Sequence, residues 1–103
     1  MTLVPANEYA DKSVKSIDDR RIYEIYPGAK LESIQDFEGR SLEPGGESGT
    51  LTITGAPARI MLRWRFAGPS AVTVNTRSVP VRRIGDGVAI EFSHTDKTAV
   101  RWR

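Results

Sequence analysis

The segment 59–66 alternates between two kinds of side chain, and one of the two sets carries arginine at three of its four positions. Alternate residues of a strand point to opposite faces, so Arg59, Arg63 and Arg65 are expected on one side. Alternate residues are about 6.6 to 6.8 Å apart, and guanidinium groups at that spacing suit carboxylates, phosphates or sulfates. The pattern predicts a strand with a candidate anion-binding face. It is equally typical of an ordinary solvated face.

Arginine recurs with the same alternation at the end of the sequence. The candidate binding residues are Arg59, Arg63, Arg65, Arg101 and Arg103, to which Arg77, Arg82 and Arg83 can be added. If the strands that carry Arg63 and Arg101 lie close together in a sheet, they form a basic stripe that binds phosphate or uronate chains with strong salt dependence. Glu91, on a strand expected between them, and the acidic N-terminal half argue against this hypothesis.

The single histidine lies in the sequence Ser93-His94-Thr95-Asp96, which holds a hydroxyl, an imidazole and a carboxylate. Neighbouring strand residues point to opposite faces, whereas a catalytic triad is assembled across a fold. The preferred interpretation of this segment is therefore a turn, and not a catalytic site.

Acidic residues gather around the glycine-rich loops of the N-terminal half. These residues are Asp36, Glu38, Glu43 and Glu47. Their oxygens suit calcium, but their spacing matches no defined calcium loop. The glycines at 45–46 and 85–87 lack the strand and helix of a phosphate-binding loop. A glycosidase needs two acids across a cleft, and Glu91 is the only acid in a late strand, so we expect no metal, no cofactor and no enzyme activity.

The aromatic residues have two interpretations. Trp64 and Trp102 are suited to stacking on sugars or bases. Each shares the apolar face of its own strand, so packing in the core is preferred. Tyr23 and Tyr26 are three residues apart and face opposite sides of a strand, so the alternation buries at most one of them.

The pattern from Arg20 onward is that of an all-β chain, in which short apolar alternations are separated by turn residues. The expected strands are 22–26, 31–37, 50–54, 59–66, 71–77, 79–84, 88–92 and 99–103. Residues 41–49 hold three glycines and a proline and are expected to form a loop. Seven or eight short strands predict an antiparallel β-sandwich over residues 20–103. Residues 1–19 have few apolar positions and are expected to form an N-terminal arm or a short helix.

Composition narrows the class of protein. A length of 103 residues fits one domain. The chain has no cysteine, which excludes disulfides and thiolate metal sites and leaves the compartment undetermined. No stretch approaches the roughly 18 apolar residues of a membrane span, so we expect a soluble domain without a membrane partner.

Charge is divided unevenly along the chain. Residues 1–50 carry six Lys or Arg against ten Asp or Glu, a balance of −4, and residues 51–103 carry nine against three, a balance of +6. Such a division can indicate a polyanionic partner. The alternative is that acidic loops lie over basic strands within one fold, and the small net charge of +2 favours it.

Three segments share an order with a known domain. Residues 25–28 are Ile-Tyr-Pro-Gly, residues 36–41 are Asp-Phe-Glu-Gly-Arg-Ser, and residues 69–75 are Pro-Ser-Ala-Val-Thr-Val-Asn. They resemble the patterns YPG … xDDGxS and PxxVxVNG in the C-terminal β-sandwich of glycoside hydrolases such as the family 31 α-glucosidases. Phe37 and Glu38 replace two acids, and Thr76 stands where glycine would close the hairpin. The resemblance implies an accessory sandwich without catalytic residues, because catalysis in that family belongs to a separate barrel.

A second resemblance covers residues 31–81. Residues 31–42, from Leu-Glu-Ser-Ile to Gly-Arg-Ser-Leu, residues 49–55, Gly-Thr-Leu-Thr-Ile-Thr-Gly, and residues 78–81, Ser-Val-Pro-Val, are similar to the periplasmic β domain of the bacterial shape protein RodZ. The arginine strand and the N-terminal arm depart from that pattern. This resemblance implies a role in assembly and not in sugar binding.

These observations favour a non-catalytic accessory or binding domain of the carbohydrate-active-enzyme type. We expect its partner to be an acidic polysaccharide or a partner protein domain, contacted through the arginine-rich sheet face. The alternatives are a structural or assembly module that mediates protein–protein contacts, and a small β protein that binds polyanions or nucleic acid, the nucleic acid being disfavoured. The sequence does not determine the oligomeric state.

Overall fold

The chain folds into eleven β-strands within the residues that the computed structural model describes, which are 2–6, 20–27, 31–46 and 49–103. The strands are β1 (Thr2–Pro5), β2 (Arg20–Tyr26), β3 (Ile34–Gln35), β4 (Ser41–Pro44), β5 (Thr50–Thr54), β6 (Ala58–Trp64), β7 (Val72–Val74), β8 (Arg77–Val79), β9 (Arg82–Ile84), β10 (Gly87–His94) and β11 (Lys97–Trp102). The predicted all-β class is confirmed. No helix among the described residues is long and apolar enough to cross a membrane.

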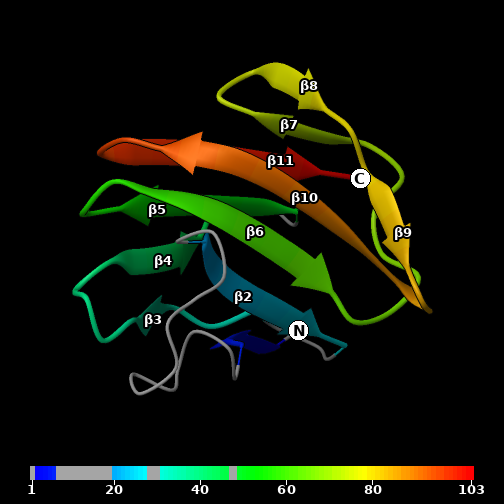
Figure 1. The fold of residues 1–103 in the computed structure, drawn as a ribbon, viewed down its shortest axis with the longest axis horizontal. Coiled ribbons are helices and arrows are strands. Elements are labelled where there is room, and N and C mark those ends of the chain that lie inside the picture. Colours follow the sequence, from blue (N-terminus) through cyan, green and yellow to red (C-terminus); the bar gives the residue numbers. More distant parts are fainter. Residues whose placement is uncertain (1, 7–19, 28–30, 47–48) are drawn as a thin grey trace.

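The strands form two sheets that lie one over the other (Figure 1). Sheet A has the order β1-β2-β6-β10-β9, and sheet B has the order β3-β4-β5-β11-β7-β8. The pairing of β2 with β6 is parallel, and every other pairing is antiparallel. The predicted antiparallel sandwich is therefore correct except at the centre of sheet A.

The core lies between the inner faces of the two sheets. Sheet A contributes Leu3, Tyr23, Ile25, Ile60, Leu62, Trp64, Val88, Ile90 and Phe92, and sheet B contributes Leu42, Leu51, Ile53, Val72, Val74 and Val100. Trp64 is fully buried and meets the edge of Trp102 at a ring-centroid distance of 5.4 Å, which confirms the prediction that it packs in the core. Tyr23 is fully buried and Tyr26 is exposed, as their spacing predicted.

Several expected boundaries are wrong. The strand expected at 31–37 is limited to Ile34–Gln35, and the one expected at 79–84 is divided between the end of β8 and β9. Residues 41–44 form β4 and not a loop, because Leu42 is fully buried in the core and its strand pairs with both β3 and β5. The strand expected at 71–77 is instead the hairpin of β7 and β8. Its turn lies at Asn75 and Thr76, whose φ angles of 50° and 70° reverse the chain.

The N-terminal segment contributes an edge strand. Residues 1–19 were expected to form an arm or helix, but Thr2–Pro5 forms β1 and pairs with β2, and Leu3 enters the core. The amide of Ala6 continues this pairing with a 2.8 Å hydrogen bond to the carbonyl of Ile22. Residues 7–19, where a helix was considered, lie outside the described residues.

Candidate functional site: two basic surfaces on opposite sheets

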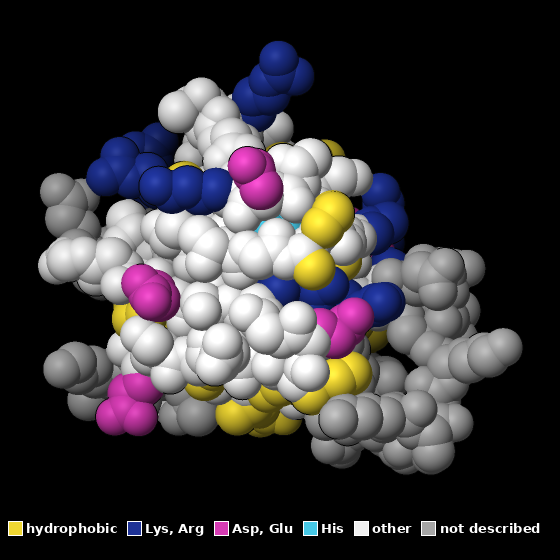
Figure 2. All heavy atoms as spheres, turned by 90° about the vertical axis from the view of Figure 1, so that its left-hand side faces the viewer, with side chains coloured by type: hydrophobic (Ala, Val, Ile, Leu, Met, Phe, Trp, Pro, Cys, Tyr) yellow, Lys and Arg dark blue, Asp and Glu magenta, His cyan; other side chains and the backbone are white. Residues whose placement is uncertain are grey.

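The five predicted binding arginines lie on two different sheets. Arg59 and Arg63 belong to β6 of sheet A and Arg65 follows it, whereas Arg101 belongs to β11 of sheet B and Arg103 follows that strand. All occupy outward-facing positions of their strands, because the residues that alternate with them, Ile60, Leu62, Trp64 and Val100, are in the core. The predicted single stripe that joins Arg63 to Arg101 is therefore wrong. Figure 2 agrees, because Lys and Arg side chains lie on both sides of this end view.

The outer face of sheet A carries a network of arginines around two glutamates. We call it the arginine face, and it consists of Arg20, Glu24, Arg59, Arg63, Arg65, Arg82 and Glu91. Arg20 and Glu24 were not among the binding residues predicted from the sequence. Both have the outward parity of β2, which alternates with the buried Tyr23 and Ile25, so the alternation itself could have indicated them.

Glu91, on β10, is shared by three arginines. Arg20 donates a hydrogen bond to its carboxylate, Arg59 approaches at 3.3 Å, and Arg82 lies at 4.0 Å. Because β6 lies between β2 and β10, the contact from Arg20 to Glu91 spans the central strand of the sheet. The hydrogen bond from Arg20 is the largest cause that lowers the pKa of Glu91 from its ordinary value of 4.5. Burial acts in the opposite direction, and Arg59 adds to the lowering.

Glu24, on β2, is shared by the other two arginines of the face. Its Oε2 atom lies 3.3 Å from Nη2 of Arg63 and 3.4 Å from Nε of Arg65. The register places Glu24 opposite Arg63 on the neighbouring strand, where a cross-strand pair of opposite charges is favourable. The hydroxyl of Tyr26 also donates a hydrogen bond of 3.4 Å to Glu24.

Three arginines of the face remain accessible despite these contacts. The side chains of Arg59, Arg65 and Arg82 keep 53%, 46% and 62% of their surface exposed, whereas those of Arg20 and Arg63 keep 24% and 19%. Within the part of the chain that the structure describes, this face therefore brings five positive charges together with two negative ones, and the most exposed of these are arginines. This surface can accept further carboxylates or sulfates.

An apolar cluster lies on the same side of sheet A. It consists of Ala6, Ile22, Met61 and Ala89, which are 8% exposed or less although they do not belong to the main core. Ile22 and Met61 are opposite each other in register, and Met61 is also opposite Glu91. The long contact from Arg20 to Glu91 thus spans the strand that carries Met61. Arginine stems commonly cover apolar surface in this way.

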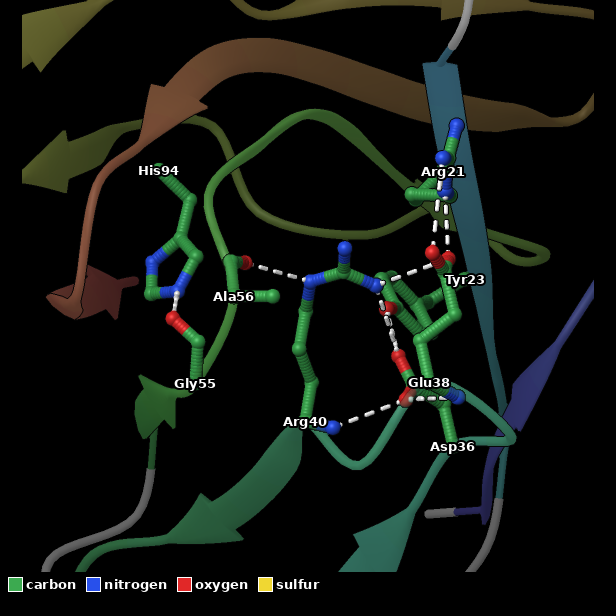
Figure 3. A network of polar contacts seen from close by, with 8 residues as sticks. All are labelled: Arg21, Tyr23, Asp36, Glu38, Arg40, Gly55, Ala56 and His94. Carbon is green, nitrogen blue, oxygen red and sulfur yellow. Dashed lines mark hydrogen bonds and ion pairs between the residues drawn. The ribbon is translucent and has the colours of Figure 1, made fainter.

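A second charged network closes one end of the sandwich (Figure 3). The carboxylate of Asp36 accepts hydrogen bonds from the Tyr23 hydroxyl at 2.5 Å, from the backbone amides of Glu38 and Arg40 at 2.9 and 2.8 Å, and from the Arg40 guanidinium at 3.1 Å. The side chains of Asp36 and Arg40 are 0% and 1% exposed. The donors that surround Asp36 show that it is held by the protein itself.

Arg40 links this network to the loop between β5 and β6. Its Nε atom donates to the carbonyl of Ala56 at 2.7 Å, and its Nη1 atom also contacts Glu38 at 3.1 Å. Glu38 in turn accepts a hydrogen bond of 2.6 Å from Arg21 of β2. Asp36 and Glu38 are thus paired with arginines. Glu43 lies on the outer parity of β4, and Glu47 lies outside the described residues.

The histidine is a buried structural residue. His94 ends β10 and is 2% exposed, with Nδ1 2.8 Å from the Thr98 hydroxyl and Nε2 3.1 Å from the Gly55 carbonyl. The turn expected at residues 94–97 is shorter, since only Thr95 and Asp96 lie between β10 and β11. Among the described residues, no three His, Asp or Glu side chains stand close enough to hold a metal ion.

Arg101 and Arg103 line a hollow of about 520 Å³ at one end of sheet B. The side-chain hydroxyls of Thr50, Thr73 and Ser78 belong to residues of the same hollow. The two basic surfaces differ in chemistry: the arginine face is a network of ion pairs, and the surface on sheet B is a hollow lined by hydroxyl groups beside arginines.

Comparison with known proteins adds no relative, since no family model, no curated protein and no solved structure matches this chain. The resemblances to the glycoside hydrolase accessory sandwich and to the RodZ domain therefore stay predictions. What is established is an all-β sandwich with basic surfaces on both sheets.

Proposed function

We propose that this chain is a non-catalytic binding domain that contacts an acidic polysaccharide through its arginine face. The observation that carries the proposal is that, among the described residues, five arginines of one sheet contact two carboxylates and three of these arginines stay 46% to 62% exposed. Such a face has an excess of positive charge at a fixed spacing, set by the strands. The network extends over β2, β6, β10 and β9, so a polymer that crosses these strands can meet several arginines at once.

The accessible arginines have donors left for a ligand. A guanidinium group has five N–H donors, and Arg59, Arg65 and Arg82 each contact one carboxylate of the face at 3.3 to 4.0 Å. The arginine of each pair is about half exposed, and solvent screening weakens such contacts. A carboxylate or sulfate of a polysaccharide can therefore add to these contacts or replace them at small cost.

The test is calorimetric titration with polygalacturonate, dextran sulfate, neutral dextran and a DNA duplex at low and high salt. We expect binding to an acidic polysaccharide that weakens as salt rises, and no binding to dextran. The triple variant Arg59→Gln/Arg65→Gln/Arg82→Gln should lose at least about tenfold in affinity. The variant Arg77→Gln is the control on the other sheet, because Arg77 is an exposed residue of β8.

Two outcomes contradict the proposal. If neither acidic polysaccharide binds, or if the control variant loses as much affinity as the triple variant, the arginine face is not the contact surface. If only the DNA duplex binds, the partner is a nucleic acid. Light scattering during size-exclusion chromatography tests the assembly alternative, which predicts a stable oligomer.

The variant Glu91→Gln tests the proposal in the opposite direction, because it should raise the affinity for an acidic polysaccharide. It removes the carboxylate that occupies three arginines and leaves their positions on the sheet unchanged. Affinity for an acidic polysaccharide should rise by about two- to fivefold, because the arginines that contact Glu91 no longer have that carboxylate as a competing partner. A fall in affinity would show that Glu91 positions the arginines for the ligand.

A further inference from the structure

A row of polar side chains crosses the end of sheet B, within the hollow of about 520 Å³. The register places Arg101 of β11 opposite both Thr50 of β5 and Thr73 of β7, and Thr73 opposite Ser78 of β8. All four have the outward parity, because Leu51, Val72 and Val100 point into the core. One guanidinium is thus flanked by hydroxyl groups on both sides.

The backbone around this row is held by hydrogen bonds beyond the regular strands. The amide of Trp102 donates to the carbonyl of Gly49 at 2.9 Å, and Arg103 and Ala71 exchange hydrogen bonds of 3.1 and 3.2 Å. Gly49 has a φ of 78°, and a Cβ atom there would lie 2.4 Å from the carbonyl oxygen of Trp102. The strands that carry the row are therefore fixed in place before any ligand arrives, which lowers the entropic cost of binding.

The chemistry of the hollow is that of an oxyanion site. Arg101 and Arg103 supply two positive charges, and no Asp or Glu is among the described residues that line it. The hydroxyl groups can donate to an oxyanion or exchange hydrogen bonds with the hydroxyls of a sugar. Arg101 and Thr50 also make contacts within the chain, but a guanidinium has enough donors to serve both. The volume lies within the range of about 300 to 1,000 Å³ typical of small-molecule sites.

We propose that this hollow is a second binding site, which takes a sugar-sized ligand that carries a carboxylate, sulfate or phosphate group. Arg101 binds the oxyanion, and Thr73 and Ser78 hydrogen-bond the ligand beside it. The site lies on the sheet opposite the arginine face. Binding in this hollow therefore does not depend on whether the arginine face binds a polysaccharide.

The experiment is a titration of the ¹⁵N-labelled chain, followed by its amide NMR signals. The probes are sodium glucuronate, glucose 6-sulfate, inorganic phosphate and neutral glucose. We expect saturable shifts at the amides of Thr73, Ser78 and Arg101 with at least one anionic probe and none with glucose. The probe that binds identifies the oxyanion.

Three variants decide which residues are responsible. Arg101→Gln should weaken binding of the active probe by at least about tenfold, and Thr73→Val should weaken it while the fold, judged by the remaining amide signals, is unchanged. Arg59→Gln/Arg65→Gln on the arginine face should leave it unaltered. The proposal is overturned if no anionic probe gives saturable shifts at these amides, if glucose binds as well as the anions, or if Arg101→Gln retains full affinity.

Discussion

The buried pair of Asp36 and Arg40 should dominate the stability of one end of the sandwich. Each carboxylate oxygen of Asp36 accepts two hydrogen bonds: Oδ1 from the amides of Glu38 and Arg40, and Oδ2 from the Tyr23 hydroxyl and the Arg40 guanidinium. In Asp36→Asn, the NH₂ group faces two of these donors whichever way the amide is turned. The charge of Arg40, which is 1% exposed, also loses its nearest buried partner.

The magnitude follows from these contacts. Each lost hydrogen bond to a charged group is worth about 1.5 to 3 kcal/mol, and removing one partner of a buried ion pair costs about 3 to 5 kcal/mol. Arg40 keeps its contact with Glu38, so we expect a loss of about 3 kcal/mol for Asp36→Asn. This is a large share of the roughly 5 to 15 kcal/mol by which such domains are stable.

Urea unfolding followed by tryptophan fluorescence measures this loss, because Trp64 is fully buried in the core. With an m-value of about 1 to 3 kcal/mol per M, the midpoint should fall by at least about 1 M. Tyr23→Phe removes a single hydrogen bond and should cost about 1.5 kcal/mol or more. The exposed Arg59→Gln is the control, with an expected effect within about 0.5 kcal/mol.

A double-mutant cycle completes the test. In Asp36→Asn/Arg40→Met the buried positive charge is gone as well, so the double variant should be less destabilised than the sum of the single variants by at least about 1 kcal/mol. The reasoning is refuted if Asp36→Asn costs less than about 1 kcal/mol and the two effects add. The network would then be solvated in solution.

Three further predictions concern single positions and are each checked by thermal unfolding. Gly49→Ala should lower the free energy of unfolding by more than about 1 kcal/mol, because φ is 78° and the new Cβ would meet the carbonyl oxygen of Trp102. An unchanged melting temperature would contradict this close approach. Thr76→Gly should raise the free energy of unfolding by as much as about 1 kcal/mol, because Thr76 has a φ of 70°. A loss of stability would mean that the Thr76 hydroxyl is needed. Glu91→Gln should destabilise the chain at neutral pH. Folding lowers the pKa of Glu91 below 4.5. The difference in unfolding free energy between the wild type and Glu91→Gln is therefore fully present above pH 4.5 and shrinks as the pH falls through the lowered pKa. A stability difference that does not depend on pH would argue against the ion pairs.

The sequence predicted correctly what depends on local alternation. The parity of residues 59–66 placed Trp64 in the core and Arg59, Arg63 and Arg65 outside, because side-chain direction in a strand follows from the backbone alone. The same rule predicted that at most one of Tyr23 and Tyr26 is buried, and only Tyr23 is. It failed at Leu42, where Pro44, the last residue of β4, and the glycines that follow it suggested a loop.

Strand order could not be predicted from local patterns. Arg63 and Arg101 have similar surroundings in the sequence, yet β6 and β11 belong to opposite sheets. Which strands pair depends on contacts between residues far apart in the chain. For the same reason, Asp36 and Arg40 were not expected to be buried: charged residues in a turn are usually exposed, and only the packing of the turn against Tyr23 and Ala56 encloses them.

The parallel pairing of β2 with β6 has a consequence for how the chain folds during its synthesis. Its register joins Arg20 to Arg59, and the intervening segment contains β3, β4 and β5, which belong to the other sheet. The central pairing of sheet A therefore closes a long loop, which is entropically costly and slow. Until Ala58–Trp64 has left the ribosome, β2 can pair only with β1 and lacks the central strand of sheet A. We expect this interval to be the time when the nascent chain most needs protection from aggregation.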